Sequence, residues 1–214
     1  MKIGIYGGSF DPIHWGHLLL AETSLRECGL DQLVFVPTGV APHKPDRAFA
    51  PAEDRINMLT LAISGYDEFG VSRFEIDSNA GRNYTIDTLR YFQETLLKKT
   101  FIVPELHLIL GADMFNDLSN WYQVDEICRL AIPVVAARPN TPPPNYEALA
   151  SVVSPKRLEL FRTRLVPMPL IELSSTQIRK CLAEGKSIRF QTPRAVETYI
   201  ATHGLYTDAG LKFR

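Results

Sequence analysis

Short apolar runs alternate along the chain with segments in which apolar residues recur at the spacing of an α-helix. The runs lie at residues 3–6, 33–36, 106–110 and 131–136, and runs of this length are typical of buried strands. Helical faces between them are marked by Leu18, Ala21, Leu25 and Cys28, by Ile56, Leu59 and Ile63, and by Ile86, Leu89, Phe92 and Leu96. The alternation predicts an α/β fold with a doubly wound, mostly parallel sheet, whose ligands bind at the carboxyl ends of the strands.

A proline-rich segment at residues 139–145 interrupts this alternation, and its prolines exclude a helix interior. Beyond it, residues 175–185 and 192–204 each begin with helix-starting residues and end at a glycine, which predicts two helices. We therefore expect a single α/β domain over residues 1–206, with a core of about 1–138, the connection 139–145, a C-terminal helical extension over 146–206, and a tail over 207–214.

The composition is that of an ordinary globular protein. The chain has 214 residues, of which 45% are hydrophobic and 22% charged, enough for one domain with an extension. Its 23 basic and 24 acidic side chains give a net charge of −1. That balance provides no overall field for a polyanion, so we expect no nucleic-acid partner, although a small phosphorylated ligand remains compatible.

Cysteine usage and hydropathy indicate the compartment. Cys28, Cys128 and Cys181 lie far apart with no CxxC spacing, which argues against a zinc site and against a disulfide framework. No apolar stretch approaches the length of a membrane span, and the N-terminus runs directly into a strand pattern. We therefore expect a cytoplasmic protein with no membrane partner and no signal peptide.

The segment that joins the first strand to the first helix carries the densest chemistry. Gly7 and Gly8 permit a tight turn and a close approach of the backbone to a ligand. His14 and His17 fall on one side of the first helical turn, with Gly16 between them, and amides at a helix N-terminus favour an anion. The pattern predicts phosphate binding; alternatively, His14 caps the helix backbone and His17 packs against the sheet.

Further candidate anion ligands lie at other predicted loops and helix starts. Lys44, in the loop after the second strand, suits a phosphate as a point charge, or is a solvated lysine. Asp113 can accept ribose hydroxyls or serve as a helix N-cap. Ser175 and Thr176 begin a helix with Arg179 one turn along, which fits a second anion site, although capping alone explains Ser175.

Tyr84 and Trp121 each stand at a predicted helix start, where two aromatic faces can hold a flat heteroaromatic ring. Thr85 can bind a carboxylate beside them. The alternative is that both aromatics belong to the core. Arg138 is either a phosphate ligand or a charge at the rim.

The remaining histidines and one charged cluster have structural interpretations. His107 lies inside an apolar strand pattern and His203 at a helix end. Residues 53–55, Glu-Asp-Arg, are typical of the charged first turn of a helix.

These motifs resemble a known family. Residues 8–12 (Gly-Ser-Phe-Asp-Pro) and 14–17 (His-Trp-Gly-His) are similar to the signature of the HxGH nucleotidyltransferase superfamily, which is related to the class I aminoacyl-tRNA synthetases. From Gly7 to about Tyr206 the chain resembles the bacterial nicotinate-nucleotide adenylyltransferases of that superfamily, and the resemblance implies a Rossmann-like fold. The further matching blocks are residues 42–44, 53–55 with Met58, 84–85 with 88–89, 111–113, Trp121, 137–139, 174–176 with 178–179, 199–200 and 205–206.

The resemblance implies transfer of the adenylyl group of ATP to nicotinate mononucleotide, which gives deamido-NAD and pyrophosphate in NAD biosynthesis. The implied catalytic residues are His14, His17, Lys44 and Arg179. The implied ATP-binding residues are Gly7, Gly8, Ser9, Phe10, His14, His17, Gly111, Asp113, Ser175, Thr176 and Arg179. The implied mononucleotide-binding residues are His43, Lys44, Tyr84, Thr85, Trp121 and Arg138. Because the sequence has no dense carboxylate cluster, we expect Mg²⁺ to arrive with ATP and expect no dedicated metal ligands.

Two other functions are compatible with the first block. One is another HxGH transferase, of the nicotinamide mononucleotide, pantetheine-phosphate or CDP-alcohol type; the other is a catalytically silent nucleotide-binding module. The chain departs from the family pattern at Thr38, where Asn is usual, at Ala41, where Pro is common, and at Asn83, where Ser is usual. A homo-oligomer is compatible with the sequence, which does not decide the oligomeric state.

Overall fold

The computed structural model describes residues 1–39, 50–78, 83–137, 142–169 and 171–207. Within these ranges the strands form one six-stranded sheet in the order β3-β2-β1-β4-β5-β6, and every neighbouring pair is parallel. This order confirms the predicted α/β, doubly wound, Rossmann-like class. The strands are β1 (Lys2–Gly8), β2 (Gln32–Pro37), β3 (Phe69–Val71), β4 (Glu105–Gly111), β5 (Ala131–Ala137) and β6 (Leu165–Pro167).

The topology fixes where a ligand can bind. From β1 the chain builds the sheet outward through β2 to β3, and then returns to the other side of β1 to place β4, β5 and β6. The order therefore reverses between β1 and β4. A crevice forms outside the carboxyl ends of the strands at such a reversal, so residues just after Gly8 and Gly111 are the best placed to contact a ligand.

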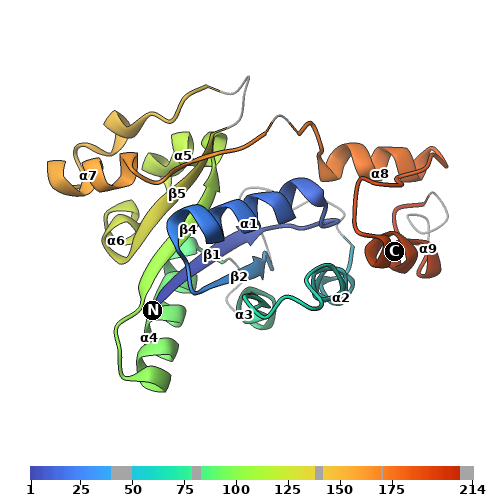
Figure 1. Cartoon of the computed structure of the whole chain (residues 1–214), viewed down its shortest axis with the longest axis horizontal. Coiled ribbons are helices and arrows are strands. Elements are labelled where there is room, and N and C mark those ends of the chain that lie inside the picture. Colours follow the sequence, from blue (N-terminus) through green and yellow to red (C-terminus); the bar gives the residue numbers. More distant parts are fainter. Residues whose placement is uncertain (40–49, 79–82, 138–141, 170, 208–214) are drawn as a thin grey trace.

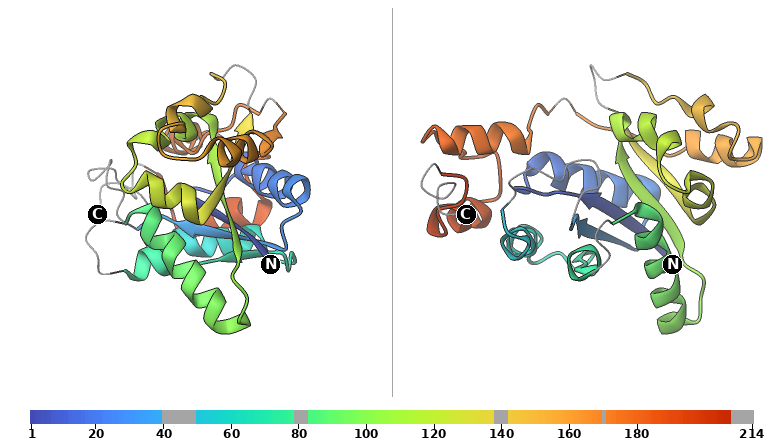
Figure 2. Two further views of the ribbon diagram at one scale, coloured as in Figure 1. Left: turned by 90° about the vertical axis from the view of Figure 1, so that its left-hand side faces the viewer. Right: turned by 180° about the vertical axis from the view of Figure 1, so that it is seen from behind.

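Helices cover both faces of the sheet (Figures 1 and 2). They are α1 (Trp15–Cys28), α2 (Ala52–Ala62), α3 (Phe74–Asp77), α4 (Thr85–Thr100), α5 (Ala112–Asp117), α6 (Val124–Leu130), α7 (Pro155–Arg162), α8 (Ser175–Ala183) and α9 (Arg194–Thr202), with 3₁₀ segments η1 (Leu118–Asn120) and η2 (Tyr146–Leu149). One hydrophobic cluster gathers residues of α1, α2, α8 and α9, and a second gathers residues of α4 to α7. Phe35 belongs to the first cluster and Val36 to the second, because successive side chains of a strand point to opposite faces.

The structure corrects the predicted organisation at the two edges of the sheet. The edge strands β3 and β6 have three residues each and were not predicted, because runs this short carry no distinct pattern. β6 pairs with β5, so the segment 146–206 is not purely helical and contributes a strand to the sheet. The last seven residues of the predicted tail lie outside the described ranges.

The C-terminal helices return to the N-terminal half of the chain. In Figure 1, α8 and α9 lie at the carboxyl end of β1, with α9 beside α2. Tyr199 of α9 donates its hydroxyl to Asp54 of α2 at 2.9 Å and accepts from Asn57 at 3.0 Å. Residues more than 140 positions apart in the sequence thus join α9 to α2.

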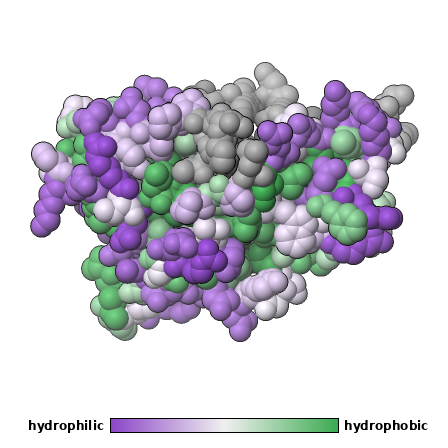
Figure 3. Space-filling model, turned by 45° about the horizontal axis from the view of Figure 1, so that its top comes forward, coloured by the Kyte–Doolittle hydropathy of each residue, from purple (hydrophilic) through white to green (hydrophobic). Residues whose placement is uncertain are grey.

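The outer face drawn in Figure 3 mixes hydrophilic and hydrophobic side chains. No helix in the described ranges is long and apolar enough to cross a membrane.

Candidate active site

Two histidines form the cap of α1. Nδ1 of His14, the N-cap residue, accepts the Gly16 amide at 3.1 Å, and Nδ1 of His17 accepts the His14 amide at 3.3 Å. This is a reciprocal capping box in which imidazoles replace the usual hydroxyl and carboxyl groups. The capping role of His14, which the sequence offered as an alternative to phosphate binding, is therefore present.

The same bonds fix the protons of the two rings. A ring nitrogen that accepts an amide proton carries none itself, so a neutral imidazole held in this way has its proton on Nε2. The His14 and His17 rings lie 3.7 Å apart between centroids with an interplanar angle of 22°, so they are stacked on one side of the helix start as predicted. Capping thus presents Nε2–H as the donor on both rings.

Any side chain at position 16 would crowd this stack. A Cβ added to Gly16 would lie 3.0 Å from two atoms of the His14 ring. The ring of His14 is buried, with 4% exposure, whereas His17 is intermediate. Gly16 therefore lets the first ring lie flat against the helix start.

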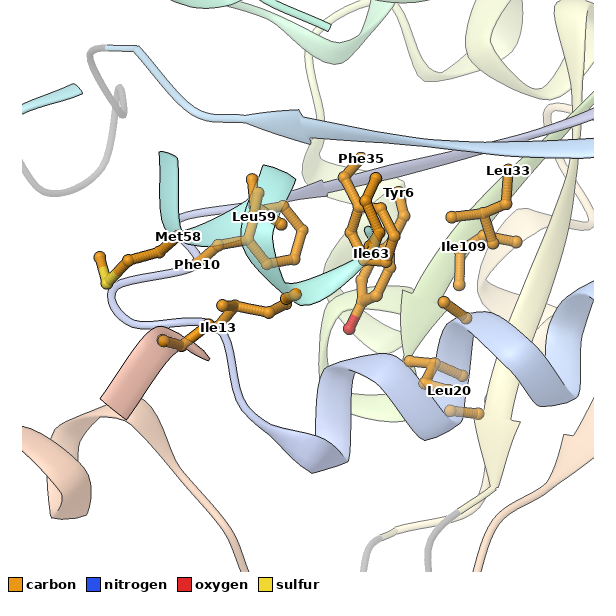
Figure 4. Close-up of a cluster of buried hydrophobic side chains, with 14 of the residues drawn as sticks. Tyr6, Phe10, Ile13, Leu20, Leu33, Phe35, Met58, Leu59, Ile63 and Ile109 are labelled. Atoms are coloured by element: carbon orange, nitrogen blue, oxygen red, sulfur yellow. The ribbon is translucent and has the colours of Figure 1, made fainter. Parts of the chain in front are cut away.

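The turn before α1 bends later than the sequence indicated. Gly7 and Gly8 are the last residues of β1, and the left-handed residue is Phe10, with φ of 46°. The Phe10 ring is fully buried (Figure 4), and a Cβ on Gly8 would lie 2.9 Å from it. Packing of Phe10 against Tyr6 and Phe35, at centroid distances of 5.3 and 5.4 Å, anchors the bend. The tight turn expected at the two glycines is wrong, although no described atom lies within 4 Å of an added Cβ on Gly7.

The C-terminal helices hold the backbone of the turn between β1 and α1. Three consecutive carbonyls there accept side-chain donors from the last forty residues: Asp11 O from Arg179 at 2.5 Å, Pro12 O from Ser175 at 2.9 Å and Ile13 O from Thr192 at 2.8 Å. In return, the Trp15 amide donates to Gln191 O at 3.2 Å. The position of His14, which follows these carbonyls, is consequently set by residues some 160 positions away.

A buried carboxylate lies under the same turn. Asp11 has 0% exposure; its Oδ1 accepts the Tyr206 hydroxyl at 2.6 Å and the Ala50 amide at 3.1 Å, and its Oδ2 lies 3.6 Å from Arg179. Burial raises the pKa of Asp11 above its ordinary range, and these partners, with Arg55, oppose the rise. Burial likewise raises the pKa of the Tyr206 hydroxyl.

Arg55 is a structural residue of this region that the sequence interpretation misplaced. It is buried, with 3% exposure, and its guanidinium donates to the carbonyls of Ser9 at 3.0 Å, Thr38 at 2.8 Å and Ala50 at 3.3 Å. Burial lowers the pKa of Arg55. Its place one helical turn before Leu59, on the apolar face of α2, was the available signal.

The start of α8 combines a cap with contacts to the turn. The N-cap is Ser174, whose Oγ accepts the Gln177 amide at 3.2 Å, so capping by Ser175 is wrong. Arg179 donates to the Thr176 hydroxyl at 3.2 Å as well as to Asp11. These bonds take two of the five N–H donors of a guanidinium and fix its plane.

At the end of β4, the N-cap of α5 is Gly111, so the capping interpretation of Asp113 is wrong. Asp113 is exposed in the first turn. Its Oδ1 lies 2.5 Å from where a Cβ on Gly111 would stand. Glycine at 111 therefore leaves room for a carboxylate at the strand end.

The predicted aromatic pair is arranged differently from a simple sandwich. Tyr84 is the N-cap residue of α4, which begins at Thr85 as predicted, and its ring lies 4.8 Å from that of Tyr122. Trp121 ends η1 and donates its Nε1–H to Asp117 at 3.2 Å; the helix predicted to begin at this residue begins at Val124.

A second buried carboxylate, which the sequence did not indicate, lies on this aromatic side. Glu75 of α3 accepts the Thr88 hydroxyl at 2.8 Å and the backbone amide of Gly39. Burial raises the pKa of Glu75. A Cβ on Gly39 would lie 2.3 Å from the Glu75 carbonyl oxygen and 2.8 Å from Asn83 Oδ1, so only glycine fits where the chain leaves β2.

Three predicted site residues, His43, Lys44 and Arg138, lie outside the described residues, as does Ala41. The structural interpretation of His107 is supported, since it has 0% exposure and its Nε2 lies 2.8 Å from Glu105. His203 follows α9 and its Nδ1 lies 2.9 Å from Tyr199 O. Within the described ranges no three His, Cys, Asp or Glu side chains group so that they could hold a metal ion.

Comparison with known proteins agrees with this geometry. A family model described as cytidylyltransferase-like matches residues 5–181. Proteins of Thermomicrobium roseum and Thermus thermophilus, both named "probable nicotinate-nucleotide adenylyltransferase", are 40% and 41% identical to the chain; each match covers 96% of the chain, and 91% and 100% of the relative. Two structures of the Plasmodium falciparum nicotinic acid mononucleotide adenylyltransferase, complexed with APC and with NaAD, superpose with TM-scores of 0.69 and 0.68 at 19% and 20% identity. They cover 96% of this chain, and 96% and 97% of theirs.

The topology, the histidine cap at the first strand end and the matched family model together define a nucleotidyltransferase of the cytidylyltransferase-like family. Within that family, the chain belongs to the nicotinate-nucleotide adenylyltransferases.

Proposed function

We propose that the protein transfers the adenylyl group of ATP to nicotinate mononucleotide, giving nicotinate adenine dinucleotide (deamido-NAD) and pyrophosphate in NAD biosynthesis. One observation carries the proposal: the His14–His17 capping box places two Nε2–H donors at a helix N-terminus, next to the strand end where the sheet order reverses. The names of the relatives specify which nucleotide is the acceptor.

The reaction needs positioned charge rather than a protein base. A phosphate oxygen of the mononucleotide attacks the α-phosphorus of ATP in line; a new P–O bond forms, the bond to the bridging oxygen breaks, and pyrophosphate leaves with those electrons. Because the nucleophile is already an anion, no proton has to be removed from it. Catalysis therefore rests on holding the two phosphates together and on stabilising negative charge at the α-phosphate.

The turn between β1 and α1 supplies that stabilisation in our proposal. His14 and His17 donate Nε2–H to oxygens of the α-phosphate, and the amide groups at the start of α1 add their partial positive charge. The backbone at Gly7, Gly8, Ser9 and Phe10 lines the approach of the nucleotide. Since Nδ1 of each ring is already bonded to the backbone, the donors are oriented before substrate binds.

The remaining ATP contacts come from two other strand and helix ends. Arg179, with Ser175 and Thr176, faces the β- and γ-phosphates from the start of α8, and Lys44 assists from the loop after β2. At the end of β4, Gly111 and Asp113 accept hydrogen bonds from the ribose hydroxyls. The support is that Arg179 and Ser175 already bond to the turn that carries His14.

The acceptor nucleotide is proposed to bind on the side of Tyr84, Thr85 and Trp121, with His43, Lys44 and Arg138 completing its site.

Mg²⁺ is proposed to arrive as the ATP complex, since the described residues offer no carboxylate cluster that fits a bare ion. We also propose that residues 1–206 act as one domain, because Ser175 and Thr192 of the C-terminal part bond to the turn between β1 and α1. We propose a cytoplasmic location, because the three cysteines form no disulfide.

The test is an acceptor panel scored by pyrophosphate release. Nicotinate mononucleotide, nicotinamide mononucleotide and phosphopantetheine are each supplied with ATP and with CTP. We expect release with nicotinate mononucleotide and ATP, and formation of a dinucleotide. Preference for another acceptor would overturn the substrate assignment, and ATP binding with no release for any acceptor would make the chain a silent nucleotide-binding module.

A further inference from the structure

The hydroxyl of Tyr206, in the C-terminal part of the chain, contacts the carboxylate of Asp11 in the turn between β1 and α1. Tyr206 follows α9, is buried with 9% exposure, and donates to Asp11 Oδ1 at 2.6 Å. Leu205, just before it, is anchored by its amide on Ile200 O at 3.1 Å and by burial in the first cluster. The fixed end of α9 therefore places the Tyr206 hydroxyl beside Asp11.

We propose that Tyr206 is a positioning residue of adenylyl transfer, which holds Asp11 so that Asp11 in turn fixes Arg179 and the turn that carries His14. This inference deepens the proposed function and rests on it. Nothing in the proposed chemistry uses Tyr206 or Asp11 directly, because the Tyr206 hydroxyl donates to Asp11 and a carboxylate has no donor for a phosphate.

The contacts around Asp11 show how the effect is transmitted. Arg179 bonds to the carbonyl of Asp11 at 2.5 Å and lies 3.6 Å from its Oδ2. If the carboxylate turns or takes up a proton, the ion pair weakens, and the guanidinium keeps only its bonds to Asp11 O and to the Thr176 hydroxyl. His14 lies three residues further along the same turn.

All groups of the described residues that act on the Asp11 carboxylate oppose its protonation. They come from four places: the Tyr206 hydroxyl after α9, Arg179 on α8, Arg55 on α2 and the Ala50 amide before α2. Among them Tyr206 is the strongest partner, and burial alone drives the pKa of Asp11 upward. Removal of the hydroxyl therefore leaves the carboxylate closer to protonation and less firmly oriented.

The experiment compares Tyr206→Phe with Tyr199→Phe. Both changes remove one hydroxyl from a tyrosine of the C-terminal part, but Tyr199 bonds to Asp54 and Asn57 between α9 and α2. For Tyr206→Phe we expect kcat to fall about 10- to 100-fold, the size that follows from a small misplacement of reacting groups, with a much smaller change in KM for nicotinate mononucleotide. We expect Tyr199→Phe to stay within about twofold of the unmodified protein.

The pH profile separates positioning from a general loss of structure. In Tyr206→Phe the acid limb of kcat is expected to move to higher pH, because Asp11 is protonated more readily, and in Tyr199→Phe it is expected not to move. If Tyr206→Phe is less stable, a double-mutant cycle with Asp11→Asn still decides, since a residue that acts through Asp11 gives non-additive effects on kcat.

Three outcomes are distinguishable. An active unmodified protein whose Tyr206→Phe variant matches Tyr199→Phe in kcat and in acid limb overturns the positioning role and leaves the proposed function intact. Additive effects of Tyr206→Phe and Asp11→Asn also overturn it. An unmodified protein that releases no pyrophosphate with nicotinate mononucleotide overturns the proposed function itself.

Discussion

The two sides of the proposed active site are held in different ways. On the side proposed for ATP, the turn between β1 and α1 is held at three consecutive carbonyls and at its carboxylate by residues of the C-terminal part. On the side proposed for the acceptor, Tyr84 and Trp121 are half-buried, and Tyr122, whose ring lies 4.8 Å from that of Tyr84, is 55% exposed. We call the first the rigid side, because these bonds hold it, and the second the adaptable side, because its aromatic side chains are partly exposed.

Each side nevertheless contains one buried carboxylate, and the partners of the two differ. Asp11 faces two arginines and a buried hydroxyl, whereas Glu75 is bonded mainly to the Thr88 hydroxyl and the Gly39 amide. Charged partners on the ATP side connect separate elements to the catalytic turn. Neutral partners on the acceptor side attach the end of β2 to α3 and α4.

The difference follows from what each side has to do. Charge at the α-phosphate is stabilised best by donors that need no rearrangement, so we expect rigidity on the side proposed for ATP to contribute to rate. Binding a flat ring depends on contact area and tolerates adjustment. Substitutions on the two sides should therefore change different kinetic constants.

The largest expected effect comes from His17 on the rigid side. We expect His17→Gln to lower kcat about 100- to 1,000-fold, because one preorganised donor to the α-phosphate is lost. Gln at the third helical position can still bond to the N-cap amide, as in an ordinary capping box, so the thermal midpoint should change little. The measurement is steady-state pyrophosphate release together with thermal unfolding.

His17→Ala is the matched variant that also loses the cap. It should show the same loss of kcat and an additional destabilisation of about 1 kcal/mol. Near-normal turnover in His17→Ala, which has no side-chain donor, would mean that the ring serves only as a cap, and would remove the proposed mechanism.

A smaller effect, on KM and not on kcat, is expected from the removal of the Trp121 ring. Trp121→Ala should raise KM for nicotinate mononucleotide about 2- to 12-fold, which corresponds to the loss of about 0.5–1.5 kcal/mol of stacking, and should leave kcat within about twofold. Phe101→Ala is the control, because Phe101 is 88% exposed at the opposite end of α4 from Tyr84. A fall in kcat with KM unchanged would place Trp121 on the rigid side and would contradict the comparison.

On both sides of the site, the sequence predicted the features that follow from local patterns and missed those that depend on distant partners. The four long strands, the start of α4, and the stacked His14 and His17 follow from local patterns. Arg55, Tyr206 and Glu75 have partners 46, 195 and 13 positions away, at Ser9, Asp11 and Thr88. The spacing on α2 could have indicated that Arg55 is buried, but no local pattern specifies these partners.

Two errors of the sequence interpretation have a local origin. Capping was one of the two roles offered for Ser175 and for Asp113, but the N-cap residues are Ser174 and Gly111. A one- or two-residue difference in a helix start leaves the hydrophobic pattern unchanged. It nonetheless frees the Ser175 hydroxyl from capping, so that it can bond to Pro12 O.

The smallest expected effect concerns stability on the adaptable side. The pKa of Glu75 is raised above its ordinary value of 4.5 by burial, so its contribution to stability is complete below that pH and is lost as pH rises through the folded-state pKa. Glu75→Gln takes up no proton, and its amide oxygen can still accept from Thr88. From about pH 4.5 upward the thermal midpoint of the variant should therefore rise relative to that of the unmodified protein, with kcat unchanged. Glu22→Gln, at an exposed position of α1, is the control for the loss of a carboxyl group at the surface. A difference between Glu75→Gln and the unmodified protein that does not change with pH would show that the Glu75 carboxylate is not destabilised by its burial.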